Sequence, residues 1–354
     1  MKHSKFFLLF LLPSISFAQV DSTDIIVQTF MKQQKIAGLS LAINKNGKIL
    51  VNKGYGYANL EHRTLATSET VFRLASISKQ FFATAIMKLT EEGKLSLEDG
   101  VHKFFPDAPE TWRPIRIKHL LSHSSGLKRE APAYDNFKVI PDLAIIKSAY
   151  PLPLDFKTGE KYQYCNLAYY IVAEIIAQVS GMPWQEFIRK NLFVPAGMNN
   201  TVMTDYYPII PNRASGYKNE NDTFLNADAM FAIRPSGGFL STTTDMIKWD
   251  NVLRGQNIIL KRENWQQLWK PFIATSSKPG SKSFYGFGWI IDEYKGHKSI
   301  SHSGSNIGFK TYYSRFIDDK LSIIVLTNAN DANPQAIVNV LADYCFRNPN
   351  TFTD

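Results

Sequence analysis

The segment Phe72-Arg73-Leu74-Ala75-Ser76-Ile77-Ser78-Lys79 places a serine three residues before a lysine. Apolar residues then recur at helical spacing until Gly93 supplies a stop. The segment therefore predicts a helix over about residues 76–92 that begins at the serine. Residues three apart share one face of a helix, so Lys79 would lie beside Ser76. A neighbouring lysine can take the proton that a serine must lose before it attacks a carbonyl carbon.

Ser-x-x-Lys is a weak pattern on its own, and it occurs at Ser76–Lys79, Ser125–Lys128 and Ser215–Lys218. Glycine follows the serine in the second and third matches, in surroundings typical of loops. Only Ser76 opens an amphipathic helix, whose N-terminal N–H groups and dipole would stabilise a developing oxyanion. The alternative role for Ser76 is an ordinary N-cap serine.

Other kinds of hydrolytic site lack support in the sequence. The Gly-x-Ser-x-Gly pattern of a nucleophile elbow is absent. His119 and His123 are spaced as two metal ligands could be, but His-Glu-x-x-His is absent, and the segment has the pattern of a helix end that runs into a turn. We therefore expect structural roles for both histidines, and no metal ion or other cofactor.

Segments with the patterns of β-strands lie near both ends of the chain. They are residues 39–44, 48–57, 285–292, 298–303, 309–316 and 321–327. Asn46-Gly47 separates the first two and is the strongest short signal for a hairpin, because the turn needs positive φ at both residues. Helices are predicted over residues 22–34, 169–179 and 334–346, and Thr242-x-x-Asp245 predicts a capped helix through Trp249.

The economical fold is of the α/β class. Strands from both chain ends join into one antiparallel sheet, the terminal helices flank it, and a large, mostly helical lobe is inserted between them. The expected α/β lobe comprises residues 19–100 and 284–354, and the expected helical lobe comprises residues 101–283. A ligand would bind in the cleft between the lobes of this single domain.

Residues 1–18 have the pattern of a cleavable signal peptide. Lys2 and Lys5 precede the apolar run 6–12, and Ser16-Phe17-Ala18 is a small-x-small cleavage site. The run is far shorter than the roughly 20 residues of a membrane-spanning helix, and no later stretch reaches that length. We therefore expect a periplasmic or secreted protein without an integral membrane span.

The charged residues indicate which partners are expected, and the two cysteines indicate whether a disulfide is expected. The formal net charge is +9, and the basic residues are scattered, which argues against a nucleic-acid partner. Cys165 and Cys345 lie far apart in the sequence. We expect two free thiols rather than a disulfide, because unpaired cysteine is among the most buried residue types.

Two further segments, Tyr162-Gln163-Tyr164-Cys165-Asn166 and His302-Ser303-Gly304, form a set of three motifs with residues 72–79. Their order and spacing resemble the serine β-lactamase and penicillin-binding-protein superfamily. The resemblance is closest to its β-lactamase-related branch, which includes esterases, D-amino-acid peptidases and enzymes similar to class C β-lactamases. It extends over nearly the whole chain after residue 18 and implies a β-lactamase/transpeptidase-like fold. Further segments typical of the branch are 117–127, 195–201, 237–245 and 285–289.

The resemblance implies a role for each motif residue. Ser76 would be the nucleophile, and Lys79 would be the base or would hold the base. Tyr164 would shuttle protons, and either Tyr164 or Lys79 could accept the serine proton, since the two would titrate as a coupled pair. Asn166 would bind the carbonyl or amide of the substrate, although an N-cap role for its side chain is the alternative.

The third motif would line the substrate cleft with His302, Ser303 and Gly304. The backbone N–H of Ser305, which follows it, would form the oxyanion hole together with the N–H of Ser76. Much of the superfamily has lysine where this chain has His302. A permanent ammonium suits substrates that bear a carboxylate, whereas histidine titrates near neutral pH. We therefore expect neutral esters to be preferred over penicillins, with a shift toward anionic substrates as His302 gains a proton between pH 8 and pH 6.

Together these features predict an exported serine hydrolase that forms an acyl-enzyme at Ser76. Its substrate would be a small molecule or short peptide, with cell-wall fragments among the candidates. The three substrate classes left open are an ester, a peptide or amide that contains a D-amino acid, and a β-lactam. The alternative is a non-catalytic or slowly deacylating protein of the same fold that binds penicillin or senses peptidoglycan.

Overall fold

The structure is a computed structural model that describes residues 22–204, 208–227, 235–255, 258–278, 280 and 282–348. The predicted signal peptide, residues 1–18, lies outside the described residues. None of the helices within the described ranges has the length and apolar character that a membrane crossing requires.

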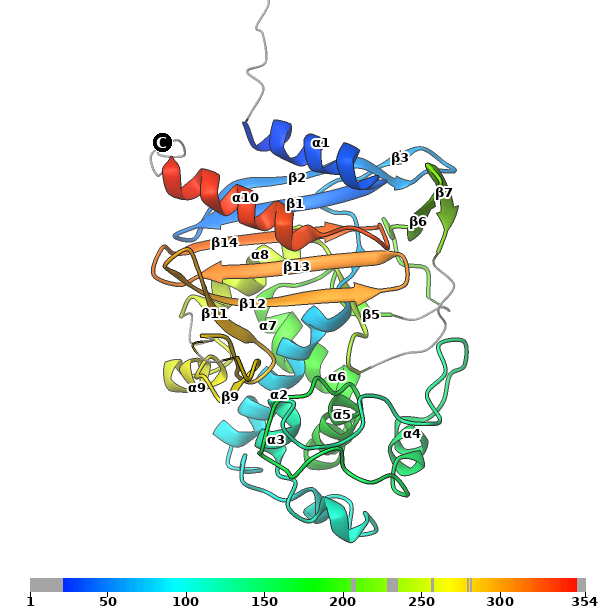
Figure 1. The fold of residues 1–354 in the computed structure, drawn as a ribbon, viewed down its shortest axis with the longest axis vertical. Coiled ribbons are helices and arrows are strands. Elements are labelled where there is room, and N and C mark those ends of the chain that lie inside the picture. Colours follow the sequence, from blue (N-terminus) through cyan, green and yellow to red (C-terminus); the bar gives the residue numbers. More distant parts are fainter. Residues whose placement is uncertain are drawn as a thin grey trace, which may run out of the picture.

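One large antiparallel sheet dominates the described residues, and it joins the two ends of the chain (Figure 1). Its strands, in spatial order, are β3 (Thr64–Leu65), β2 (Lys48–Asn59), β1 (Gly38–Lys45), β14 (Leu321–Thr327), β13 (Phe309–Phe316), β12 (His297–Asn306), β11 (Ile290–Tyr294), β10 (Phe284–Tyr285) and β9 (Ile273–Ala274). β1 pairs with β14 from Leu39↔Thr327 to Lys45↔Leu321, so a strand near residue 40 lies beside one near residue 325. The predicted fold class is confirmed.

Turn residues explain where the predicted strands are right and where one is wrong. Asn46 and Gly47 both have positive φ, as the predicted turn between β1 and β2 requires. The predicted strand 285–292 is instead two short strands, because the chain reverses between Tyr285 and Ile290. Gly288 sits in this reversal at φ +77°, and a Cβ there would lie 3.0 Å from the carbonyl oxygen of Lys79. The reversal therefore packs directly against the start of the helix that carries Lys79.

The terminal helices cover one face of the sheet, and the remaining helices lie on the other (Figure 1). The terminal helices are α1 (Ser22–Gln34) and α10 (Pro334–Arg347). Ile323 and Val325 of β14 belong to the apolar cluster beneath them, whereas Ile324 and Leu326 belong to the cluster on the opposite face. This alternation buries both faces of the strand, because successive side chains of a strand point to opposite sides.

The helical side is built around α2 (Lys79–Glu91), which is buried along most of its length. A 3₁₀ turn, η1 (Ala75–Ser78), precedes it, so the predicted helix over 76–92 begins with a tighter turn. The other helical segments are η2 (Val101–Lys103), η3 (Glu110–Trp112), α3 (Ile117–Leu121), α4 (Asp142–Ser148), α5 (Leu167–Ser180), α6 (Trp184–Ile188), the π-helical turn η4 (Arg189–Phe193), α7 (Val194–Ala196), α8 (Thr243–Leu253) and α9 (Arg262–Leu268). Two small sheets complete the described strands. One is formed by β4 (Phe72–Arg73), β8 (Phe239–Ser241) and β5 (Val202–Met203), and the other by β6 (Tyr217–Glu220) and β7 (Thr223–Asn226).

Phe81 of α2 packs edge-on against Phe193, Phe239 and Trp249, with ring centroids 4.9–5.6 Å apart.

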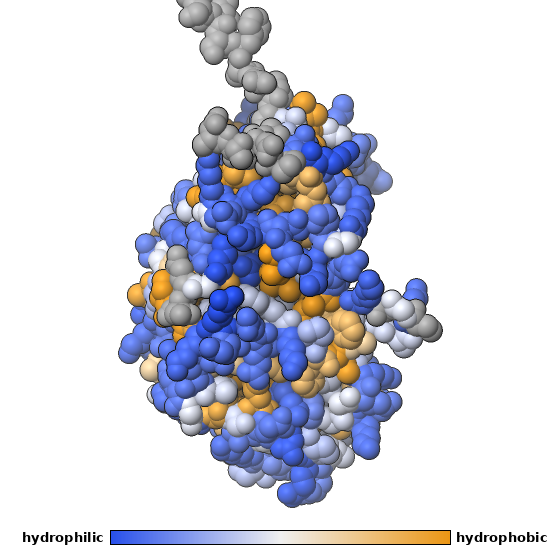
Figure 2. Space-filling view, turned by 90° about the vertical axis from the view of Figure 1, so that its left-hand side faces the viewer, coloured by the Kyte–Doolittle hydropathy of each residue, from blue (hydrophilic) through white to orange (hydrophobic). Residues whose placement is uncertain are grey.

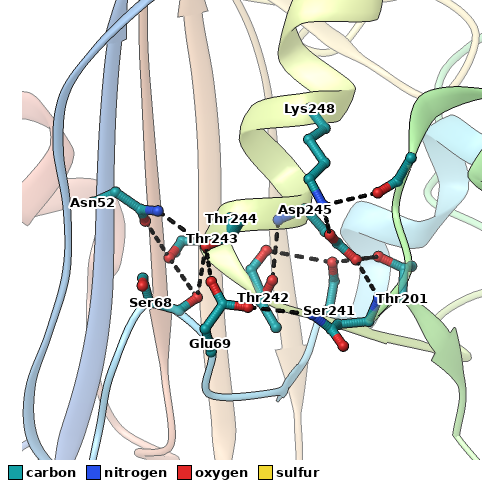
Figure 3. A network of polar contacts seen from close by, with 12 residues as sticks. Asn52, Ser68, Glu69, Thr201, Ser241, Thr242, Thr243, Thr244, Asp245 and Lys248 are labelled. Carbon is teal, nitrogen blue, oxygen red and sulfur yellow. Dashed lines mark hydrogen bonds and ion pairs between the residues drawn. The ribbon is translucent and has the colours of Figure 1, made fainter.

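A polar network fixes the start of α8 to the large sheet and to the helical side (Figure 3). The Thr242 hydroxyl accepts from the N–H of Asp245 at 3.0 Å, which is the predicted N-cap. The Asp245 carboxylate does not complete a capping box, because it accepts from Thr201 and Lys248 instead. Thr243 donates to Asn52 of β2 at 2.8 Å. The network therefore helps to set the position of α8 against β2.

A second, fully buried carboxylate ties α8 to the sheet. One oxygen of Asp250 accepts from Tyr313, Arg315 and Ser322, and the other accepts from Asn44 and Arg254. Burial alone would raise the pKa of Asp250, but the two arginines and the hydroxyl donors outweigh it and hold the pKa below its ordinary value. The folded state therefore favours the charged form of this carboxylate.

Asp250→Ala should lower the free energy of unfolding by about 3–5 kcal/mol, because it leaves buried cationic donors without their acceptor. Asp318→Ala removes an exposed carboxylate and should change it by less than about 0.5 kcal/mol. Since the folded pKa of Asp250 is depressed, its contribution is fully present above pH about 4 and is lost as the pH falls further. Urea unfolding at pH 7 and pH 3 measures both effects, and equal losses for the two variants would contradict the assignment.

Candidate active site

Ser76 lies in a strained turn at the start of α2. The turn is anchored by the N–H of Leu74, which donates to the carbonyl of Phe239 on β8 at 2.9 Å. Ala75 has φ +49°, a conformation that costs a non-glycine residue on the order of 1 kcal/mol or more. The Ser76 side chain caps no helix, so the alternative N-cap role is wrong. Strain of this kind concentrates at functional sites, where surrounding contacts hold it in place.

Gly304 explains how the third motif reaches Ser76. A Cβ at Gly304 would lie 2.2 Å from the carbonyl oxygen of Leu74 and 2.1 Å from the hydroxyl of Thr311. Only glycine therefore lets β12 lie directly against η1. This close approach brings Ser303 and Ser305, on either side of Gly304, to the wall of the same cleft as Ser76.

Lys79 lies beneath Ser76 and is fully buried. Its Nζ is 3.2 Å from the Ser76 hydroxyl, 2.9 Å from Asn166 Oδ1 and 2.7 Å from the carbonyl oxygen of Ser236. The two shorter contacts are to groups that can only accept a hydrogen bond, whereas the hydroxyl can accept or donate. One proton can therefore move between Lys79 and Ser76 while the other two contacts stay in place.

Asn166 precedes α5 but does not cap it with its side chain. Its Oδ1 accepts from Lys79, and its Nδ2 donates to Glu130 at 2.5 Å. The alternative N-cap role for this side chain is therefore wrong. The amide joins the buried lysine to an acidic residue at the edge of the cleft.

Tyr164 closes one side of the site, with its ring 4.7 Å from Lys79 Nζ and 5.3 Å from the guanidinium of Arg129. Burial raises the pKa of Tyr164 well above its ordinary value, although an interaction with the Ser76 side chain opposes this. The phenol therefore keeps its proton at neutral pH.

His302 corrects one expectation from the sequence. Its Nδ1 is 2.6 Å from the carbonyl oxygen of Ser303, which can only accept, so Nδ1 carries a proton and Nε2 accepts from the Tyr285 hydroxyl at 2.8 Å. Burial, reinforced by the nearby Lys79, lowers the pKa of His302 to about 3. The expected gain of a proton between pH 8 and pH 6 is therefore wrong, because the ring stays neutral over that range.

These residues surround a cleft of about 440 Å³. Its lining includes the predicted residues Ser76, Tyr164, Asn166, His302, Ser303 and Ser305. Sequence reasoning missed the other polar residues of the lining, which are Arg129, Glu130, Tyr162, Ser236 and Asn306. Arg129 and Glu130 give the cleft a cation and an anion, and both lie in a loop where no spacing pattern marks them.

The other Ser-x-x-Lys matches do not form a comparable pair. Lys128 pairs with Asp155, and Lys218 pairs with Glu220. Ser215 accepts from Asn59 at 3.0 Å. Neither lysine is in contact with the serine of its own match through a described hydrogen bond, which leaves Ser76 as the candidate nucleophile.

The histidines and cysteines have structural positions. His119 accepts from the N–H of Arg116 at the start of α3, and burial lowers its pKa to about 4. His123 is buried behind Tyr164, with ring centroids 4.3 Å apart. Within the described ranges, no cluster of three or more histidine, cysteine, aspartate or glutamate side chains could hold a metal ion. Cys165 and Cys345 are both buried, and they are thiols rather than the two halves of a disulfide, as predicted.

Comparisons with known proteins identify a family and a shared fold. The family model described as Beta-lactamase matches residues 24–343. Penicillin-binding protein 4* of Bacillus subtilis is 30% identical, with 91% of this chain and 75% of that protein covered. The octameric penicillin-binding protein homologue from Pyrococcus abyssi has a TM-score of 0.82 and 29% identity, with 93% and 78% covered. D-amino acid amidase from Ochrobactrum anthropi shares the fold, with a TM-score of 0.80 and 21% identity over 92% of this chain and 99% of that one.

Proposed function

The chain belongs to the Beta-lactamase family, and from this premise we propose that it is an exported serine hydrolase that works through an acyl-enzyme at Ser76. The observation that carries the proposal is the 3.2 Å contact between Lys79 Nζ and the Ser76 hydroxyl at the wall of a cleft. A buried amine within hydrogen-bond reach can remove the serine proton, and a serine so activated is a nucleophile.

The contacts of Lys79 support a specific order of proton transfers. In the neutral form that the proposal requires, Lys79 would keep donating to Asn166 and to the carbonyl of Ser236, and it would turn its lone pair toward the Ser76 hydroxyl in place of a donated hydrogen. The Ser76 oxygen bonds to the substrate carbonyl carbon as its proton passes to Lys79, and the electron pair of the C=O double bond moves onto oxygen. The N–H groups of Ser76 and Ser305 would stabilise that oxyanion.

Tyr164 suits the second half of acylation. As a neutral phenol beside Ser76, it can give a proton to the leaving group when the bond between that group and the carbonyl carbon breaks. Lys79 can then return its extra proton to the phenolate. Water would attack the resulting ester of Ser76 by the same route in reverse, which releases the acid product and restores the serine.

The neutral His302 supports uncharged acyl compounds as the preferred substrates, since the cation of Arg129 is accompanied in the same lining by the anion of Glu130. His302 is neutral and uses both ring nitrogens within the protein, so it offers no charge to a substrate carboxylate. We propose esters and D-amino-acid amides ahead of β-lactams. The shared fold of D-amino acid amidase and the relationship to penicillin-binding proteins support the amide and β-lactam classes.

A slowly deacylating penicillin-binding protein is the second candidate, favoured by the similarity to penicillin-binding protein 4*. A panel of chromogenic esters, D-aminoacyl amides and β-lactams, with intact-mass detection of acylated protein, tests both. Continuous turnover of an ester or amide supports the hydrolase. Stoichiometric acylation by penicillin without turnover of any panel member would support the second candidate, and no acylation at all would refute both.

The ratio of anionic to neutral turnover should stay within about twofold between pH 8 and pH 6. His302 has a pKa of about 3 and gains almost no proton over this range. The measurement compares kcat/KM for a carboxylate-bearing ester and its neutral analogue, because both share Ser76 and any titration of it. A rise of about tenfold toward pH 6, lost in a His302→Gln variant, would show that the imidazole is protonated in the cleft.

A further inference from the structure

A second cavity, of about 820 Å³, lies at the other end of β12 and β13 from Ser76. Ser303 and Ser305 line the cleft, whereas Phe316, which pairs with Ser299, lines this cavity. Its walls are the ends of α8 and α9 and the turns after β1 and β13. Figure 2 views the molecule from the side on which α9 and the turn after β13 lie in Figure 1, and hydrophilic residues cover most of that face. We call it the Arg315 cavity.

The lining of the Arg315 cavity is strongly cationic. Its charged members are Arg254, Arg262, Arg315 and Lys320, and no aspartate or glutamate is among the described residues that line it. Behind the wall, the Asp250 carboxylate pairs with Arg254 and Arg315, but four positive charges still exceed this single negative charge. Charges in excess repel one another, and the repulsion is stronger near buried walls than in open water. An anion in the cavity would relieve it.

One buried carboxylate already serves two of these cations. Asp250 accepts from Arg315 Nε and from Arg254 Nε, each at 2.8 Å. It is also saturated by Tyr313, Ser322 and Asn44, so it has no capacity for a further donor. A single negative charge therefore holds two arginines in place and leaves one positive charge uncompensated at the cavity wall.

Unused donors accompany this excess charge. Arg315 is 4% exposed, and its Nη1 has no hydrogen-bond partner among the described residues. The indole N–H groups of Trp265 and Trp269, which line the same cavity, also lack partners there. The Arg315 guanidinium lies 5.0 Å from the ring centroid of Trp269, which holds it in place. Because protein atoms cover each of these N–H groups, an anion in the cavity would be attracted by the positive charge and N–H dipoles that lie just behind its wall.

We propose that the Arg315 cavity binds a phosphate group carried by a small molecule. A phosphate offers several acceptor oxygens to donors that converge from different elements, and arginine is the side chain best matched to it. The volume lies within the range of small-molecule sites and exceeds what a phosphate alone would fill. Trp269 and Phe316 supply aromatic surface for the rest of the molecule. The site shares no lining residue with the cleft, so it does not depend on the proposed hydrolase function.

Titration calorimetry of the full chain with inorganic phosphate, at constant ionic strength, tests the proposal. We expect one saturable site. Arg262→Gln and Lys320→Gln should each weaken binding by about threefold to tenfold, since each removes one charged donor from a partly exposed wall. The matched controls are Arg189→Gln and Lys190→Gln, which remove exposed cations of η4 and should bind phosphate as the wild type does.

Trp269→Phe keeps an aromatic ring against Arg315 and removes one indole N–H, so it should also weaken binding. Circular dichroism and thermal unfolding confirm that each variant is folded, and none of them touches Ser76. Absence of saturable binding, or equal loss in the cavity variants and the η4 controls, would overturn the proposal. Acetate that binds as tightly as phosphate at the same ionic strength would overturn it in favour of a carboxylate site.

Discussion

Replacing Ser76 with alanine should abolish turnover of every substrate, with a loss of about 10⁴- to 10⁶-fold in kcat. The hydroxyl is the proposed attacking atom, and it is the one that a described hydrogen bond joins to the buried Lys79. The fold should persist, because the substitution removes one 3.2 Å hydrogen bond to Lys79, worth on the order of 1 kcal/mol. Intact-mass analysis after treatment with an active-serine phosphonate should show one adduct on the wild type and none on the variant.

The chain supplies its own controls for this experiment. Ser125→Ala and Ser215→Ala alter the serines of the other two Ser-x-x-Lys matches, and both should keep the adduct and the activity. Peptide mapping should place the adduct on Ser76. An adduct on Ser125 or Ser215, or undiminished turnover in Ser76→Ala, would refute the assignment of the nucleophile.

Much of the fold was predictable because local signals and burial patterns agree. Asn46-Gly47 forms the predicted turn, which depends on the local preference of these two residues for positive φ. The predicted strands 309–316 and 321–327 have the same bounds as β13 and β14. The error at residues 285–292 has a local cause that only the fold reveals. Gly286 and Gly288 are compatible with an apolar strand when only the sequence is considered. In the fold they lie at the reversal, and the backbone of Leu268 and of Lys79 comes so close to them that a side chain would have little room.

The candidate site was predictable as far as its motifs extend. Ser76, Tyr164 and Asn166, with His302 and Ser303 of the third motif, carry recognisable patterns, and the fold brings them to one cleft. Arg129 and Glu130 have no pattern of their own, because their place at the cleft depends on how a long loop packs against α5. The neutral state of His302 could not be predicted from the sequence either, because it follows from the burial of the ring beside Lys79 and not from the identity of the residue.

Replacing Lys79 with methionine should lower the acylation rate by about 10²- to 10⁴-fold, the usual contribution of a positioned general base. Methionine has a similar length and no charge, so it leaves Asn166 Oδ1 and the Ser236 carbonyl without a donor but adds no clash. Lys128→Met is the matched control, because Lys128 pairs with Asp155 outside the proposed proton path. Rapid-quench measurement of acyl-enzyme formation reports the step directly. Loss of activity with unchanged acylation would assign Lys79 to deacylation alone.

Tyr164→Phe should separate the two proton transfers that Lys79 and Tyr164 are proposed to perform. Burial keeps the Tyr164 phenol protonated at neutral pH, so its part is to donate to the leaving group and not to activate Ser76. A 4-nitrophenolate leaves without a proton, whereas an amine does not. The variant should therefore lose about 10²- to 10⁴-fold on a D-aminoacyl amide and about tenfold or less on the matching 4-nitrophenyl ester. Lys79→Met should slow both substrates, because both need the serine to be deprotonated.

Tyr162→Phe provides the control for this comparison, since Tyr162 lines the same cleft two residues earlier. It should leave the ratio of amide to ester turnover unchanged within about threefold. If Tyr164→Phe slows the ester as much as the amide, the phenol acts before the leaving group departs, and the serine proton must pass through Tyr164. The resting proton arrangement around Lys79 would then be the reverse of the one proposed, with an ammonium donating to Ser76, Asn166 and the Ser236 carbonyl. That result would make Tyr164 the base in spite of its burial, with the Lys79 charge needed to draw off the phenolic proton.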